Sequence, residues 1–145
     1  MEIYVAGPLF TQAERQFNES LARSLRGLGQ TVNLPQEMSD EIYGQEDWQQ
    51  VIFDLNVEKL KDSDIVLAIL DGPIVDDGTA FEIGMAYQLG KPIVGLRTDF
   101  REAGPEGKVN LMIEKSVDMC FSVKEALDNI CQRDGRDGRE TADQA

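Results

Sequence analysis

The stretch DIVLAIL, residues 64–70, decides the fold. Every residue in it after Asp64 is apolar. An alternating pattern would indicate a strand with one face in water, whereas a continuous apolar run of this length is typical of a strand buried on both faces. Such strands lie in the middle of parallel sheets that helices cover on both sides. The run therefore predicts a central strand of an α/β domain.

Four further segments resemble strands, and segments with helical spacing separate them. This alternation predicts a parallel sheet with helices on both faces. With about five strands, the expected architecture is a single doubly wound, flavodoxin-like domain with a mainly parallel sheet. The further strands are expected at EIYVA (2–6), TVNLP (31–35), KPIVGLR (91–97) and VDMCF (117–121), with helices over 11–29, 47–64, 79–90 and 122–131.

Polar residues mark where several of these helices begin and end. Thr11 with Glu14 forms the pattern of a capping box, Ser122 with Glu125 repeats it, and Gly29 suits a helix C-terminus. The helix over 47–64 places Trp48, Val51, Ile52, Leu55 and Leu60 on one face. Residues 36–46 are acidic and show no periodicity, so we expect a loop there.

The 145 residues suffice for one domain, expected over residues 1–132, while the polar, Gly-rich segment 133–145 is expected to be disordered. The formal net charge of −13 opposes binding to nucleic acid polymers but allows a small nucleoside-sized ligand. No apolar run is long enough to span a membrane. The start MEIYVAG shows no export signal, so we expect a cytoplasmic protein.

The absence of histidine narrows the possible chemistry. It excludes Ser-His-Asp and Cys-His catalysis and most zinc sites. Cys120 and Cys131 lack metal-type spacing, and two buried reduced thiols are expected. An enzyme with this sequence must use carboxylates, Tyr, Lys or Cys, and neither a metal nor an organic cofactor is implied.

Ligands of doubly wound sheets bind beyond the carboxyl ends of the strands, where the strand order reverses. That rule selects AGPLF (6–10), which contains Gly7, and DGPIVDDGTAFE (71–82). The second segment concentrates Asp76, Asp77 and Glu82 at the start of a helix, with Gly78 permitting close approach of a ligand.

Glu82 supports two interpretations. Thr79-x-x-Glu82 has the spacing of a capping box, which would make the glutamate structural. Three carboxylates, however, exceed what one cap needs. A glutamate in the first helical turn would be held ionised by the helix dipole, and an oriented carboxylate can attack a glycosidic carbon while a second acid protonates the leaving group.

Four segments together resemble the nucleoside 2-deoxyribosyltransferase family: IYVAGPLF (3–10), SDIVLAILDG (63–72), DDGTAFEIGMAYQLGKPIVGLRTDF (76–100) and VNLMIE (109–114). The resemblance implies a double displacement with retained configuration, in which Glu82 attacks C1′ of a 2′-deoxynucleoside and a second nucleobase displaces it. Tyr4 matches the tyrosine that orients this glutamate; without the resemblance, a core aromatic in a strand would be the simpler interpretation.

The same resemblance assigns the remaining residues. Asp76 matches the acid that assists protonation of the base, Asp77 is the alternative, and a solvated turn would otherwise explain both. Asn110 and Met112 match residues that a neighbouring subunit contributes, which implies a homo-oligomer, a dimer or larger. Asn56 stands where the family usually has an aspartate that binds the sugar or base, so base preference is expected to differ. The long tail also departs from the family, where many chains end close to the active site.

Two other functions remain open. The first is an N-glycosidase that hydrolyses 2′-deoxynucleosides or their 5′-monophosphates, although AGPLFTQAE (6–14) offers no arginine to a phosphate before Arg15. The second is a non-catalytic nucleotide-binding module. The segment 97–110 is either a surface connection or, given its length, a lid or subunit contact.

Overall fold

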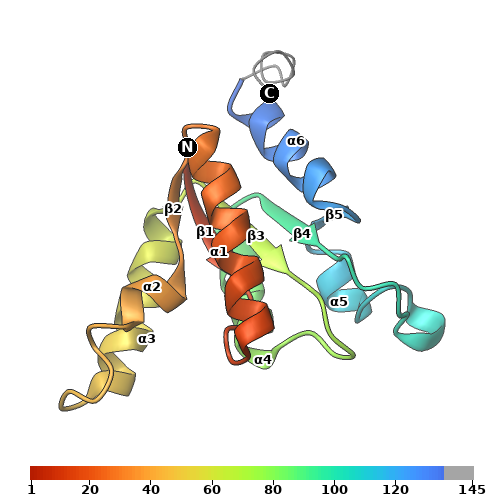
Figure 1. Ribbon diagram of the computed structural model, residues 1–145. Helices are drawn as coiled ribbons and strands as arrows, with labels where there is room; N and C mark the ends of the chain where they lie inside the picture. Colours follow the sequence, from red (N-terminus) through yellow and green to blue (C-terminus); the bar gives the residue numbers. More distant parts are fainter. Residues whose placement is uncertain (136–145) are drawn as a thin grey trace.

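The computed structural model describes residues 1–135, which form one five-stranded sheet with helices on both faces (Figure 1). All pairings are parallel and the strand order is β2-β1-β3-β4-β5, as the flavodoxin-like prediction requires. The strands are β1 (Glu2–Ala6), β2 (Thr31–Asn33), β3 (Ile65–Ile69), β4 (Ile93–Leu96) and β5 (Asp118–Cys120).

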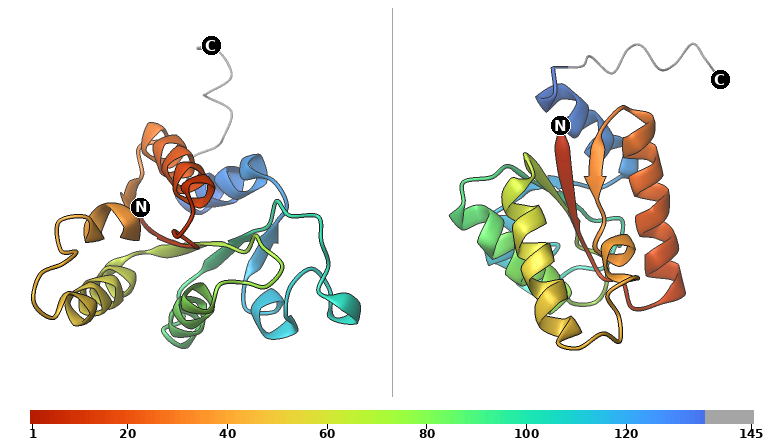
Figure 2. Two further views of the ribbon diagram at one scale, coloured as in Figure 1. Left: turned by 60° about the horizontal axis from the view of Figure 1, so that its bottom comes forward. Right: turned by 90° about the vertical axis from the view of Figure 1, so that its left-hand side faces the viewer.

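The helices connect successive strands and cover both faces of the sheet. Figure 2 shows α1 and α6 on one side and α3, α4 and α5 on the other. The elements are α1 (Gln12–Gly27), α2 (Pro35–Ser39), α3 (Trp48–Asp62), α4 (Asp77–Gln88), the 3₁₀ turn η1 (Gly104–Glu106), α5 (Leu111–Glu114) and α6 (Val123–Arg133).

The central strand β3 is buried throughout, as its sequence predicts. Its alternate residues serve two cores: Ile65, Leu67 and Ile69 pack on the side of α1 and α6, and Val66, Ala68 and Leu70 on the opposite side. β1 divides in the same way, with Ile3 and Val5 on one face and Tyr4 and Ala6 on the other. This alternation decides that the Tyr4 side chain faces α4.

Three predictions within the elements need correction. Residues 35–39 form α2, whereas Pro35 was expected to end a strand and residues 36–46 to form a loop. Pro35 stands at the first helical position, where its fixed φ favours a helix, and is buried with Gln36. α4 begins at Asp77, two residues before the predicted start. On α3 Leu60 is buried, but Val51 is exposed, so the predicted apolar face holds only in part.

The helix starts of α1 and α6 and the burial of both cysteines agree with what the sequence predicts. The capping box of Thr11 and Glu14 is present, and Ser122 caps α6 by accepting a hydrogen bond from the Glu125 backbone. Cys120 and Cys131 are both buried and form no disulfide with each other. α6 ends at Arg133, and residues 136–145 of the predicted tail lie outside the described residues.

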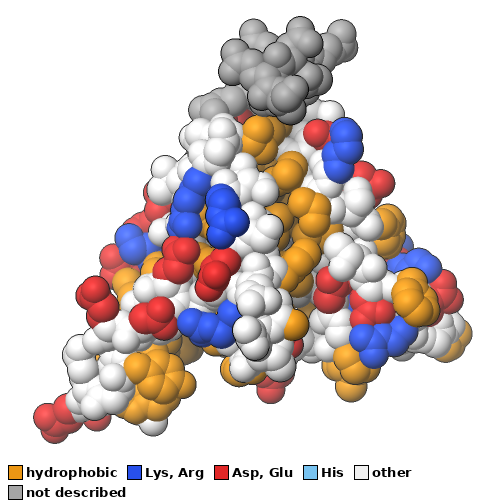
Figure 3. Space-filling model, in the orientation of Figure 1, with side chains coloured by type: hydrophobic (Ala, Val, Ile, Leu, Met, Phe, Trp, Pro, Cys, Tyr) orange, Lys and Arg blue, Asp and Glu red, His pale blue; other side chains and the backbone are white. Residues whose placement is uncertain are grey.

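The surface carries both signs of charge despite the net charge of −13. On the face in Figure 3, hydrophobic side chains form a band between α1 and α6, and acidic and basic side chains intermix beside α1. Arg26 and Glu37 form an ion pair at 2.6 Å that links α1 to α2. Within residues 1–135, no helix is both long and apolar enough to cross a membrane.

Candidate active site

The site lies where β1 and β3 meet the start of α4, at the switch point that the sheet order creates. Tyr4 pairs with Val66 across the two strands, and its ring is fully buried. Its hydroxyl donates a 2.6 Å hydrogen bond to Oε1 of Glu82. The structure thus joins two of the predicted catalytic residues, which lie far apart in the sequence.

Burial dominates the electrostatics of this pair. The pKa of Glu82 is raised to about 7, chiefly by burial; the hydrogen bond from Tyr4 lowers it, and the nearby charge of Asp76 adds to the rise. Burial and the Glu82 charge raise the pKa of Tyr4 as well, so its hydroxyl remains a proton donor. The Glu82 carboxyl can therefore both hold and release a proton close to neutral pH.

This result corrects the expectation that the helix dipole holds Glu82 ionised. Because α4 begins at Asp77, Glu82 is its sixth residue and lies in the second turn. The dipole acts mainly within the first turn, and burial outweighs it here. The carboxylate instead keeps a protonation equilibrium within the physiological range.

Asp76, and not Thr79, is the N-cap of α4. Its Oδ2 accepts hydrogen bonds from the backbone N–H of Thr79 at 2.8 Å and from the Thr79 hydroxyl at 2.9 Å. The predicted Thr79–Glu82 capping box is therefore wrong. Oδ1 of Asp76 accepts no hydrogen bond from the described part of the chain, so this oxygen remains available to a ligand.

The predicted glycines are close to backbone or carboxylate atoms. A Cβ on Gly78 would lie 3.3 Å from Oδ2 of Asp76, so a side chain there would crowd the cap. A Cβ on Gly7 would lie 3.0 Å from Cδ1 of Ile69, which accounts for a glycine after β1 through packing alone. Asp77 is exposed and accepts a 2.8 Å hydrogen bond from the Gly78 N–H.

Asn56 is half-buried on α3, a helix that packs beside α4. Its side chain makes no hydrogen bond within residues 1–135. The rings of Phe53 and Phe81 are 6.2 Å apart and join the two helices near it. The amide of Asn56 therefore keeps its full donor and acceptor capacity.

Asn110 and Met112 lie outside the cluster around Glu82. Asn110 is the exposed N-cap of α5, where its Oδ1 accepts a 2.9 Å hydrogen bond from the Met112 N–H. The Met112 side chain is 74% exposed. No hydrogen bond joins either residue to Tyr4, Asp76 or Glu82 within the described part of the chain.

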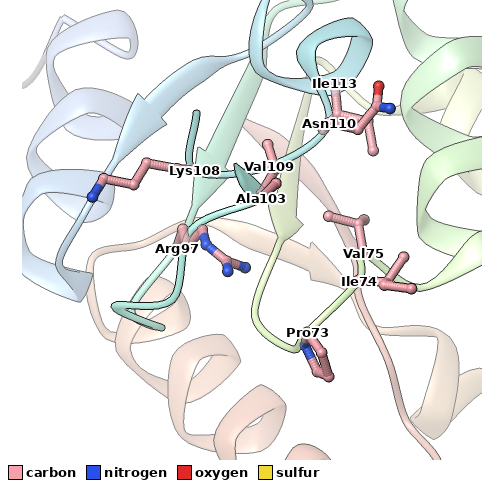
Figure 4. A pocket seen from close by; sticks show the side chains of 9 residues that line it. All are labelled: Pro73, Ile74, Val75, Arg97, Ala103, Lys108, Val109, Asn110 and Ile113. Atoms are coloured by element: carbon pink, nitrogen blue, oxygen red, sulfur yellow. The ribbon is translucent and has the colours of Figure 1, made fainter. Parts of the chain in front are cut away.

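A cavity of about 200 Å³ lies between the loop after β3 and the segment before α5, and Asn110 is one of its lining residues. Val75, Val109 and Arg97 also line it (Figure 4). In Figure 4 the Arg97 guanidinium points into the ring of lining residues, whereas the Lys108 ammonium points away from it. A larger cavity, about 560 Å³, adjoins α1 and the loops after β3 and β4; Phe17, Asn18 and Arg101 are among its lining residues.

Sequence reasoning missed three residues near the site: Asp71, Thr79 as a partner of Asp76, and Arg97. Arg97 is only 3% exposed although it carries a charge. Its position directly after the apolar residues of KPIVGLR was the available signal. Among residues 1–135, no cluster of three His, Cys, Asp or Glu side chains could hold a metal ion.

Comparisons with known proteins add independent findings. The family model described as nucleoside 2-deoxyribosyltransferase matches residues 3–131. A 2-deoxyribosyltransferase from Bacillus psychrosaccharolyticus is 30% identical with a TM-score of 0.76, and the match covers 88% of this chain and 90% of that one. No protein with curated information matches.

Two more distant structures share the fold alone with this chain. A 2-desoxiribosyltransferase from Leishmania mexicana is 24% identical with a TM-score of 0.73, over 90% of this chain and 97% of that one. A CMP N-glycosidase from Clostridium botulinum is 20% identical with a TM-score of 0.57, over 90% of this chain and 98% of that one.

Proposed function

The chain belongs to the nucleoside 2-deoxyribosyltransferase family, and from this premise we propose that it transfers a 2-deoxyribosyl group between nucleobases through a covalent ester on Glu82. The buried hydrogen bond between Tyr4 and Glu82 carries the proposal. It holds one carboxylate oxygen and leaves the other, Oε2, free to attack. A nucleophile in this position needs an oriented carboxylate that can ionise near neutral pH, which Glu82 provides.

The first displacement begins with ionised Glu82. Its Oε2 forms a bond to C1′ as the bond from C1′ to the base nitrogen breaks, and the bonding electrons remain with the base. The departing base takes up a proton from solvent, and Asp76 assists this transfer through its Oδ1, which accepts no hydrogen bond within the described part of the chain. The Tyr4 hydroxyl keeps the glutamate in the orientation that the attack requires.

The second displacement reverses these events. A nitrogen of the incoming base attacks C1′, the ester bond to Glu82 breaks with its electrons returning to the carboxylate, and the base loses a proton to solvent with the help of Asp76. Two inversions give net retention. Water in place of the base would give hydrolysis through the same ester, and this is the alternative outcome of the test below.

The loop after β1 supports substrates without a 5′-phosphate. Oε2 of Glu14 accepts hydrogen bonds from the backbone N–H groups of Phe10 at 3.0 Å and Thr11 at 2.7 Å. Free amides at a helix start are the usual seat of a phosphate, but here a carboxylate occupies them and adds negative charge. We therefore propose 2′-deoxynucleosides as the substrates.

Asn110 and Met112 support a shared site. Both are exposed at the start of α5, together with the 45%-exposed Leu111. We propose that the protein is a homo-oligomer, a dimer or larger, in which these residues complete the site of a neighbour. Sedimentation equilibrium of the purified protein tests this proposal, and a strictly monomeric protein would contradict it.

Chromatography of nucleosides tests the reaction. Purified protein is incubated with 2′-deoxyinosine, with and without cytosine or adenine, beside Glu82→Gln and the matched control Glu14→Gln. A new deoxynucleoside that needs the acceptor base, persists in the control and vanishes in Glu82→Gln supports transfer. Hypoxanthine release regardless of acceptor indicates hydrolysis, and binding without turnover indicates a non-catalytic module.

A further inference from the structure

Two loops at the carboxyl edge of the sheet are tied together by an aspartate. The loops follow β3 and β4, and Asp71 stands in the first. Its Oδ1 accepts hydrogen bonds from the backbone N–H of Thr98 at 2.6 Å and of Asp99 at 2.9 Å, and its Oδ2 accepts one from the Thr98 hydroxyl at 2.5 Å. Both oxygens of Asp71 are thus committed to the loop after β4.

A second aspartate, Asp99 in the loop after β4, connects the loops in the opposite direction. Oδ2 of Asp99 accepts a 3.1 Å hydrogen bond from the Gly72 N–H. Arg101 holds Asp99 from its other side, with Nε 2.9 Å from Oδ1. Hydrogen bonding by Arg101 lowers the pKa of Asp99, so this acceptor stays ionised over the physiological range.

Arg97 makes a third connection between the two loops, and burying its charge is energetically unfavourable. The side chain is 3% exposed, and its guanidinium donates to the carbonyl oxygens of Leu70, Gly72 and Arg101, with the last two at 3.2 Å and 3.0 Å. No carboxylate neutralises it in residues 1–135, and its Nε is a buried nitrogen without a hydrogen-bond partner. A buried cation satisfied only by carbonyls is unfavourable for folding alone.

The hydrogen bonds of Asp71, Asp99 and Arg97 hold in place the segments that lead to Asp76 and Asn110. Val75 and Val109 line the same cavity as Arg97. Val75 precedes Asp76 and Val109 precedes Asn110, and both valines belong to one buried cluster, which therefore sets the backbone position of Asp76 and Asn110. We call residues 97–114 the arm. They run from Arg97 to the end of α5, the helix that contains Met112.

The arm is also ordered internally. The Ala103 N–H donates to the Gly107 carbonyl at 2.7 Å, and the Lys108 N–H donates to Oε2 of Glu114 at 3.0 Å. Gly107 has φ 127°, and a Cβ there would lie 2.5 Å from the same oxygen. The arm therefore presents the exposed Asn110 and Met112 on a preformed element.

We propose that Arg97 and Asp71 are positioning residues that act in trans: they fix the arm so that Asn110 and Met112 of one subunit fit the Glu82 site of the next. The proposal rests on the proposed function, because it needs a site shared between subunits. It explains the retention of a buried cation that contacts no reacting group.

Subunit mixing tests whether Arg97 acts on the active site of the neighbouring subunit or on that of its own subunit. Arg97→Lys keeps the charge but cannot span three carbonyls, and should lower kcat/KM about 10²-fold. Mixed and reassembled with Glu82→Gln, it should regain activity, because a mixed pair contains one site with an intact Glu82 and an intact arm. For random pairing in a dimer, the mixture should reach about a quarter of wild-type activity.

A mixture of Asn110→Ala with Glu82→Gln is the reference. If this reference regains activity but the Arg97→Lys mixture gives only the mean of its components, Arg97 acts within its own subunit and the inference is overturned. If neither mixture gains, the shared site itself is wrong, and the inference falls with it. Full activity of Arg97→Lys alone also overturns it. Asp71→Asn, with the same expected gain, replaces Arg97→Lys if circular dichroism shows that the latter does not fold.

Discussion

The starts of α1 and α4 carry the same local pattern and use it differently. Thr11-x-x-Glu14 forms a complete capping box, with the Thr11 hydroxyl accepting from the Glu14 N–H at 3.2 Å and Oε2 of Glu14 accepting from the Thr11 N–H at 2.7 Å. At Thr79-x-x-Glu82 no capping box forms, because Asp76 is the N-cap of α4. The Glu82 side chain instead points into the protein and accepts a hydrogen bond from Tyr4.

The two glutamates consequently differ in charge state. Hydrogen bonding from the Thr11 backbone lowers the pKa of Glu14, whereas burial raises that of Glu82 to about 7. The position of the N-cap of α4, at Asp76 instead of Thr79, decides that Glu82 does not cap its helix, whereas Glu14 does. A motif of four residues therefore identifies a helix start but not the role of its acid.

The largest expected difference between the two glutamates is in activity. Glu82→Gln removes the proposed nucleophile and should lower kcat by about 10⁴-fold or more. Glu14→Gln preserves the side-chain shape of the cap and leaves the Tyr4–Glu82 pair untouched, so with a substrate that carries no phosphate it should leave kcat within about twofold. Steady-state kinetics with 2′-deoxyinosine and cytosine measures both, and equal losses would refute the contrast.

Stability should respond to pH in opposite directions at the two positions. A carboxyl whose pKa is raised on folding loses stability as the pH rises from its unfolded value, 4.5, through about 7. Glu82→Gln should therefore match wild type near pH 5 and exceed it near pH 8, by at most about 3 kcal/mol. Urea unfolding at both pH values checks this.

Glu14 provides the opposite case in the same experiment. Its lowered pKa stabilises the folded chain above 4.5, and this contribution disappears as the pH falls through the folded-state pKa. Glu14→Gln should be less stable than wild type near pH 7, by about 1 kcal/mol or less, with a smaller difference at low pH. A deficit that grows on acidification would contradict the assignment.

Tyr4→Phe should shift the pH dependence of catalysis. The hydrogen bond from Tyr4 lowers the pKa of Glu82, so its removal raises that pKa. The acidic limb of the pH–rate profile, centred near pH 7 in wild type, should move to higher pH, with the rate reduced most below pH 7. An unchanged limb would show that the observed ionisation belongs to another group.

Asp76→Asn should have the smallest effect on stability. Asn caps helices about as well as Asp, so unfolding free energy should change by only a few tenths of a kcal/mol. Removing the charge that raises the pKa of Glu82 should move the acidic limb to lower pH, while kcat falls for bases that need protonation on leaving. A large loss of stability would instead make Asp76 a structural residue.

The sequence predicts much of this fold because its signals are local. The apolar run 64–70 and the alternation of strands with helices sufficed for the sheet, whose order the structure confirms. The short helix α2 was missed, since five residues are too few to show periodicity. Pro35 was its only clear local signal.

The site was predictable only in part, because its contacts and its protonation depend on residues that are distant in the sequence and meet only in the folded chain. The identities of Tyr4 and Glu82 came from motif resemblance, and their contact is seen in the structure. The protonation state of Glu82 depends on burial by residues distant in the sequence, so the expectation of a fixed charge was wrong. The partners of Arg97 are carbonyl groups, which any sequence supplies, so no residue pattern could indicate them.

Tyr4 and Glu82 are 78 residues apart in the sequence, and the burial of Glu82 beside Tyr4 should make folding take up a proton, because burial raises the pKa of the carboxyl. In the unfolded chain near pH 6 the Glu82 carboxyl is ionised, and in the folded chain it is mostly protonated. The uptake should occur only when β1, β3 and α4 have assembled around the pair. Refolding in a weak buffer with an indicator dye would thus time the formation of the active site without any substrate.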